Sequence, residues 1–198
     1  MFTTESPDVA CDIMARLKRE TAPLHAELDA MVAPMLTERA RYRMLLAGLR
    51  DAYDIIEREL ARHAAELARF GYDFAQRTKL CWLDTDLAAP TELAPSANRL
   101  SYTLSDASAA FGAVYVVEGA TLGGQVISRQ VIPALALSPD RGCRFFSGYG
   151  AETGERWCET RGAIVAHLAA TDGPDATIAG ARRTFSLIGA ALRARIRS

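Results

Sequence analysis

An apolar stripe at helical spacing constrains the fold of this chain more than any other feature of its sequence. Between residues 37 and 69, apolar side chains recur at the spacing of one helix face, and charged side chains such as Arg50 and Asp51 fill the other face. This pattern indicates an amphipathic α-helix that packs on a core. We predict one long helix over residues 37–69, with Thr37 as its N-cap. The apolar positions are Tyr42, Leu45, Leu46, Leu49, Tyr53, Ile56, Leu60 and Leu67.

The rest of the chain also favours helices, and no segment shows the apolar–polar alternation of a half-buried strand. An N-terminal helix is expected from Pro7, with a kink or restart caused by Pro23, which removes a backbone donor. Asp106 is expected to cap a helix that Pro133 ends. The length of 198 residues fits one domain, residues 1–198, with residues 1–9 loosely ordered. The sequence therefore predicts an all-α domain of six to eight helices, with others near residues 78–88, 153–170 and 178–196.

Histidines are scarce in this sequence, and that scarcity limits the metal chemistry available. The three are His25, His63 and His167, no two of them are four residues apart, and no Glu-x-x-His pair occurs. A helical zinc site and a di-iron bundle are therefore not supported. The net charge of −1 argues against nucleic acid as the main partner. Because neither a signal-peptide pattern nor a long apolar stretch is evident, we expect a cytoplasmic protein that does not bind a membrane.

A glycine-rich stretch inside a predicted helix needs an explanation. Gly119, Gly123 and Gly124 lie within a helical pattern, and each costs about 1 kcal/mol relative to alanine in a helix interior. Gly119 and Gly123 are four residues apart and share a face with Tyr115. Two interpretations stay open: close packing against another helix, or a flat ligand that lies against bare backbone.

His25 and Lys18 form a second candidate group near the N-terminus. Lys18 precedes His25 by two helical turns, roughly 10.5 Å, so both would point the same way in a continuous helix. An imidazole and an ammonium at that separation could hold two ends of one extended ligand. The alternative is that His25 is a surface or capping residue, and His63 and His167 are expected to be partly buried structural residues.

Together these two groups occur in an order and spacing that resemble the haem oxygenase family. The resemblance covers nearly the whole chain and is to the bacterial, biliverdin-forming branch associated with bacteriophytochromes. It implies a single-domain helical bundle in which haem is sandwiched between a proximal helix and a kinked distal helix. It is carried by Leu17, Lys18, Thr21, His25, Tyr115, Glu118, Gly119, Leu122, Gly123, Gly124, Gln125, Phe145, Phe146, Tyr149, Gly150, Thr153, Gly154 and Trp157, with Trp82, Leu83, Asp86 and Leu87.

The resemblance also implies roles for individual residues. His25 matches the proximal ligand of the haem iron, and Lys18 matches a cation that contacts a haem propionate. Gly119 and Gly123 match the catalytic glycines of the distal helix, and Phe185 matches an aromatic residue that lines the pocket. The expected haem-binding set is Lys18, Thr21, His25, Tyr115, Gly119, Gly123, Gly124 and Phe185, with Arg156 and Arg161 as candidates for a second propionate cation.

An activity follows from the resemblance: oxidation of haem, both substrate and cofactor, by dioxygen to biliverdin, carbon monoxide and ferrous iron. The chain has no dinucleotide-binding or iron–sulfur motif, so a ferredoxin or a flavin reductase is expected to supply electrons. A bacteriophytochrome is a candidate receiver of the biliverdin. The alternative is a haem-binding or haem-sensing module that does not degrade haem. It is suggested by Ala120, which stands where some members carry a proton-organising aspartate.

Overall fold

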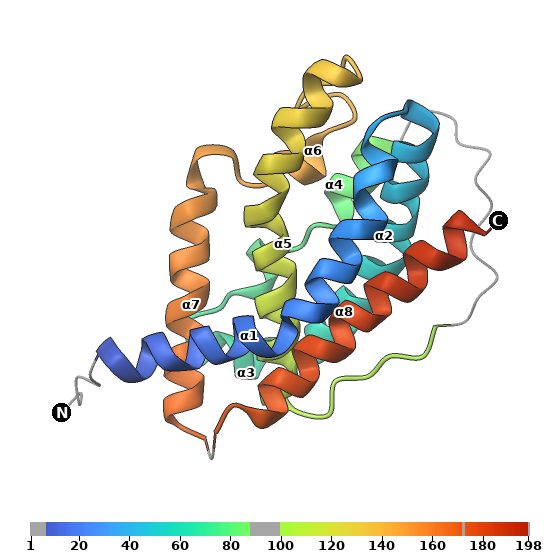
Figure 1. Ribbon diagram of the computed structural model, residues 1–198. Helices are drawn as coiled ribbons and strands as arrows, with labels where there is room; N and C mark the ends of the chain where they lie inside the picture. The colour runs from blue at the N-terminus through green and yellow to red at the C-terminus, as the bar shows by residue number, and fades with distance from the viewer. Residues whose placement is uncertain (1–6, 88–99, 172, 198) are drawn as a thin grey trace.

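The computed structural model describes residues 7–87, 100–171 and 173–197, and every regular element in these ranges is helical (Figure 1). The all-α prediction is therefore confirmed. Residues 1–6 of the expected loose N-terminus lie outside the described residues, and residues 7–9 belong to the first helix. The elements are α1 (Pro7–Val32), η1 (Ala33–Leu36), α2 (Arg39–Arg62), α3 (Ala64–Ala68), η2 (Phe74–Gln76), α4 (Leu80–Leu87), α5 (Ala107–Ala134), α6 (Arg144–Ser147), η3 (Gly150–Glu152), α7 (Thr153–Ala169) and α8 (Asp175–Ile196).

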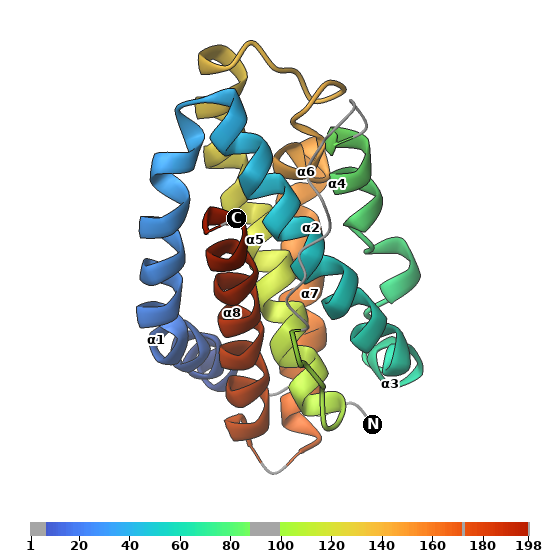
Figure 2. The ribbon, with the colours of Figure 1, turned by 90° about the vertical axis from the view of Figure 1, so that its right-hand side faces the viewer.

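Helix α5 is the centre of the bundle. Helices α8, α7, α2 and the short α6 all pack against it, and Figure 2 shows α1 on the outside, beyond α8. By length and composition alone α5 is apolar enough to cross a membrane, which corrects the expectation that no stretch is. More than half of its most apolar stretch is buried by the other helices, as in the core helix of a globular protein.

The contact between α5 and α8 depends on two glycines that have no other evident role. A Cβ atom on Gly112 of α5 would lie 2.1 Å from the Thr177 carbonyl oxygen, and one on Gly180 of α8 would lie 2.2 Å from the Ala109 carbonyl oxygen. Real Cβ atoms do not approach backbone so closely, so each helix rests directly on the backbone of the other. This crossing fixes the position of α8 relative to α5, and α1 in turn packs against α8.

The predicted long helix over residues 37–69 is two helices. His63 has φ −107° and ψ 9° and ends α2, and its Nε2 atom lies 3.2 Å from the Leu104 carbonyl oxygen. The change of direction lets α3 bring Leu67 into the core against α5. Thr37 is not the N-cap: its hydroxyl donates to the Pro34 carbonyl oxygen, and Glu38 precedes the first turn of α2.

The two prolines act close to where the sequence predicts, with a bend in α1 and the end of α5 (Figure 1). Helix α1 continues through Pro23 without a restart, although Figure 1 shows it changing direction along its length. Pro133 lies inside the last turn of α5, where its missing N–H leaves the Arg129 carbonyl oxygen without a helical donor, and the helix ends one residue later. The Asp106 cap is confirmed, since its carboxylate accepts from the Ala109 N–H at 2.8 Å.

His167 is a buried structural residue, as the sequence predicts for it. Its ring stacks on Phe111 at 4.4 Å between centroids and meets Phe70 edge-on at 5.0 Å. Its Nε2 atom hydrogen-bonds with the Ser108 hydroxyl at 2.9 Å, while Nδ1 is buried without a partner. Burial lowers the pKa of His167 below its ordinary value of 6.5, and the charge of Asp106 opposes this only in part.

The lowered pKa of His167 predicts a loss of stability in acid. The unfolded chain takes up this proton near pH 6.5 and the folded chain only at lower pH. The free energy of unfolding should therefore fall as the pH drops below 6.5, by at most about 1.4 kcal/mol per pH unit for one proton. Urea unfolding across this range should show a shallower pH dependence for His167→Gln than for the natural chain. An equal pH dependence of the unfolding free energy in the two proteins would contradict a lowered pKa of His167.

Candidate functional site

His25 is the centre of the site on α1, and its side chain is 64% exposed. Its Nδ1 atom lies 3.4 Å from the Asp29 carboxylate one turn later, and its ring meets Phe185 of α8 edge-on at 5.8 Å. A carboxylate on one ring nitrogen fixes the orientation of an imidazole and favours metal binding through the other. The arrangement therefore offers Nε2 of His25 to a metal ion.

Helix α1 is held in register on α8 by ion pairs along its outer side. Each is exposed and worth at most about 1 kcal/mol, but three along one helix pair oppose sliding. Lys18, two turns before His25, is exposed and has no carboxylate partner among the residues that the structure describes. It is therefore available to an anionic ligand group on the side of His25. The three pairs, each at 2.6 Å, are Arg16–Asp175, Glu20–Arg182 and Glu27–Arg193.

The second part of the candidate site is an open face of α5. A Cβ atom on Gly123 would meet nothing within 4 Å, and one on Gly119 would meet only the edge of the Trp157 ring at 3.8 Å. On the same face, Leu122 is 38% and Val126 68% exposed, two of the three large apolar side chains exposed among the described residues. Gly119 and Gly123 are thus not needed for helix packing. Their position favours the flat-ligand interpretation left open by the sequence.

Gly124 lies on a different side of α5. A Cβ atom there would be 3.2 Å from the Phe146 carbonyl oxygen of α6, so this glycine serves helix packing. The structure therefore does not bring Gly124 together with the other predicted haem-binding residues. Gly119 and Gly123 therefore fit the flat-ligand interpretation, whereas Gly124 fits the helix-packing interpretation. Their spacing in the sequence alone could not distinguish these two roles.

The two parts of the candidate site approach each other at Thr21 and Tyr115. Burial raises the pKa of Tyr115, and a side-chain hydrogen bond with Thr21 opposes the rise. The Tyr115 ring also packs near Trp157 of α7, with centroids 5.9 Å apart. Thr21 lies one turn before His25, and Tyr115 lies one turn before Gly119. The influence of Thr21 on the pKa of Tyr115 indicates that the two side chains lie close together, one turn before each of the two functional positions.

Sequence reasoning missed Asp29 and gave no role to Trp157. A histidine followed four residues later by an aspartate on one helix was a readable signal for Asp29. No sequence signal placed Trp157 beside Gly119, because α7 and α5 meet only in the fold. Of the candidates for a second cation, Arg156 is paired with Glu152 and Glu159, whereas Arg161 is exposed.

The chemistry of the site suits a metal that arrives with its own ligands. No group of three or more His, Cys, Asp or Glu side chains that could hold a metal ion occurs in the described part of the chain. The candidate site offers one exposed imidazole and an exposed lysine on α1, and a bare, apolar surface on α5. These features fit a flat macrocycle with a central iron and acidic substituents, which is the chemistry of haem.

Comparison with known proteins bears on the family and the fold of the chain. The family model described as heme oxygenase matches residues 11–194. A structure of the heme oxygenase from Neisseria meningitidis with NO and CO bound is 18% identical, with a TM-score of 0.79, covering 93% of this chain and 92% of that one. The heme oxygenase from Leptospira interrogans is 19% identical, with a TM-score of 0.73, and the match covers 91% and 98% of the two chains. No individually curated protein gives a significant match. The family model spans almost the whole sequence, and the chain belongs to the heme oxygenase family.

Proposed function

We propose that this chain oxidises haem to biliverdin, carbon monoxide and ferrous iron, with dioxygen as co-substrate. The observation that supports it best is the exposed His25 imidazole of α1, with the Asp29 carboxylate 3.4 Å from its Nδ1 atom, together with the open Gly119–Gly123 face of α5. When bound, haem supplies the iron and the redox chemistry. The protein supplies ligation, orientation and control of access.

Each residue of the proposed site has a physical task. Nε2 of His25 would bind the iron, and Asp29 would orient the ring and make it more basic. Lys18 would neutralise a propionate. Gly119 and Gly123 carry no side chains, so the α5 backbone itself can lie against the ligand and exclude bulky groups from that side. Contacts at the edge of the ring would come from Thr21, Tyr115 and Phe185.

The proposed reaction needs electrons from outside the chain. We propose a ferredoxin or a flavin reductase as donor, docking through basic side chains near Lys18, because the sequence contains no motif for a redox cofactor of its own. A bacteriophytochrome is the proposed receiver of biliverdin. The cytoplasmic location stays a prediction.

One observation favours a second candidate function, a haem-binding module that does not degrade its ligand. Ala120 is exposed beside Gly119, and the nearest carboxylate in the sequence, Glu118, is buried away from the open face. Residues 115–126 therefore present no acidic group on the side offered to haem. Degradation would then depend on water held by backbone groups for proton delivery.

A turnover experiment separates the two functions. The purified chain is loaded with haemin and given ascorbate or a ferredoxin–reductase pair in air, and the absorption spectrum is followed. We expect the Soret band to disappear while a biliverdin absorption grows at longer wavelength. A persistent Soret band after reduction in air would support the binding module and contradict the proposed enzyme.

A further inference from the structure

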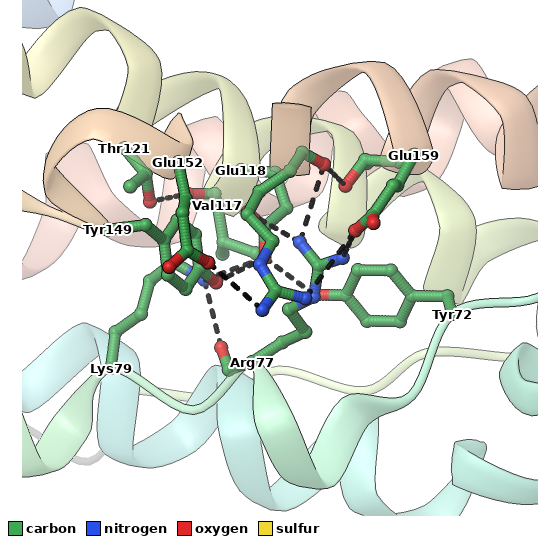
Figure 3. A network of polar contacts seen from close by, with 11 residues as sticks. Tyr72, Arg77, Lys79, Val117, Glu118, Thr121, Tyr149, Glu152 and Glu159 are labelled. Atoms are coloured by element: carbon green, nitrogen blue, oxygen red, sulfur yellow. Dashed lines mark hydrogen bonds and ion pairs between the residues drawn. The ribbon is translucent and has the colours of Figure 1, made fainter. Parts of the chain in front are cut away.

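Figure 3 shows a buried polar cluster around Glu118 of α5, the residue that directly precedes Gly119 of the open face. We call it the Glu118 cluster and define it as Tyr72, Arg77, Lys79, Glu118 and Tyr149. The side chains of Lys79 and Glu118 are each only 1% exposed, and the Lys79 Nζ atom lies 2.7 Å from Glu118 Oε1. An ion pair this deep survives only when its other hydrogen-bonding groups are also satisfied.

The cluster meets that requirement. The Lys79 ammonium donates to the Arg77 carbonyl oxygen at 2.9 Å, to Glu118 Oε1 at 2.7 Å and to the Tyr149 hydroxyl at 3.0 Å, which uses all three of its donors. Glu118 Oε1 also accepts from the hydroxyls of Tyr72 at 2.9 Å and Tyr149 at 3.1 Å. The Arg77 guanidinium lies 3.9 Å from the second carboxylate oxygen.

These contacts fasten α5 to three other parts of the fold. Tyr72, Arg77 and Lys79 belong to the connection between α3 and α4, and Tyr149 belongs to the connection between α6 and η3. Arg77 continues the network to α7, where it donates to Glu159 and to the Arg156 carbonyl oxygen. Several segments distant in sequence thus converge on the Glu118 carboxylate.

The position of Glu118 along α5 places the cluster next to the open Gly119 face. Glu118 immediately precedes Gly119, and successive side chains on a helix point about 100° apart. The cluster therefore holds α5 from one side, about 100° around the helix from Gly119, at the level where the Gly119 face is bare. This is also where three glycines lower the intrinsic helix propensity relative to alanine.

We propose that the buried Glu118–Lys79 pair is a positioning device that fixes the backbone of residues 119–123 where the haem face lies. Glu118 does not touch haem in this proposal, and it acts through the helix that carries it. The statement about haem rests on the proposed function, whereas the statement about helix order concerns the ligand-free protein.

Hydrogen exchange of the ligand-free protein tests the helix order. Glu118→Gln keeps the shape but removes the charge that Lys79 requires, so amides in residues 115–125 should exchange about ten-fold faster. Tyr149→Phe removes one hydrogen-bond donor and should give a smaller increase in the exchange rate of the same segment. This variant provides the test if Glu118→Gln does not fold. The matched control is Asp51→Asn, because Asp51 pairs with Arg195 between α2 and α8, with N–O distances of 2.7 and 3.0 Å, and touches no part of the cluster.

The pattern across the chain decides the outcome. Faster exchange in residues 115–125 in the cluster variants, with α8 little changed, supports the proposal. Unchanged exchange in that segment overturns it. An equal increase in α5 and α8, or the same increase at residues 115–125 in Asp51→Asn, overturns it too, because the cluster would then be an ordinary contribution to global stability.

The haem-loaded protein gives a second readout. The C–O stretching frequency of the ferrous carbon monoxide complex and the ratio of biliverdin isomers both report the backbone next to the ligand. Tyr149→Phe and Glu118→Gln should shift both, whereas Asp51→Asn should shift neither. If the natural chain binds haem without degrading it, the proposed reaction fails, but exchange and the C–O frequency still test the positioning. If both readouts match the natural chain in the cluster variants, the positioning proposal fails.

Discussion

His25→Ala is expected to lower the rate of haem degradation about a hundred-fold or more while leaving the helical fold intact. The exposed His25 imidazole is the nitrogen ligand that the proposed site offers to iron, and the Asp29 carboxylate lies 3.4 Å from its Nδ1 atom. Removing a metal ligand should exceed the 10–100-fold effects seen for residues that only support one. The measurement is the decay of the Soret band and the yield of biliverdin under single-turnover conditions.

The stability of the variant separates loss of ligation from loss of fold. His25 makes no buried hydrogen bond, and exposed substitutions usually change stability by less than about 0.5 kcal/mol. The thermal midpoint of the ligand-free His25→Ala protein should therefore equal that of the natural chain. Added imidazole should restore part of the activity by occupying the vacated position. A normal biliverdin yield without imidazole would remove His25 from the proposed mechanism.

The local elements of this fold could be predicted from the sequence because their signals are local. The apolar stripe of α2, the Asp106 cap and the helical character of residues 107–134 depend on neighbours within a few turns. The same reasoning failed at Thr37 and His63. At Thr37, the start of α2 is set by the preceding η1. At His63, the end of α2 is set by the contact of α3 with α5, two helices that are distant in sequence.

The residues of the site could be predicted from the sequence. Which of them are open to a ligand and which pack against other helices could not. His25, Lys18 and the glycines were found from spacing and resemblance. The distinction between an open Gly123 and a packed Gly124 depends on α6, which reaches α5 only in the folded chain. In the same way, Glu118 could be placed away from the Gly119 face by helix geometry. Its burial with Lys79 depends on a connection about 40 residues earlier in the sequence, which a helix pattern of this kind does not reveal.

Gly112 shows the same limit, and its substitution is expected to be the most damaging to the fold. In the sequence it is one small residue in a helix rich in alanine, whereas in the structure it lies against the α8 backbone. A Cβ atom would approach the Thr177 carbonyl oxygen to 2.1 Å and the Ala181 nitrogen to 2.5 Å. Both are backbone atoms, which cannot rotate away as a flexible side chain can. Gly112→Ala should therefore force α5 and α8 apart.

The expected cost of Gly112→Ala is about 3 kcal/mol or more, the upper part of the range for overpacked cores. Urea unfolding followed by circular dichroism measures it. Gly162→Ala is the matched control, because Gly162 lies within α7 and a Cβ atom there would meet nothing within 4 Å. That change should stabilise the protein by up to about 1 kcal/mol through helix propensity. Equal effects of the two substitutions would mean that the α5–α8 contact is looser than the structure shows. A large difference would establish that the backbone contact between α5 and α8, the helix on which α1 packs, is essential to the stability of the fold.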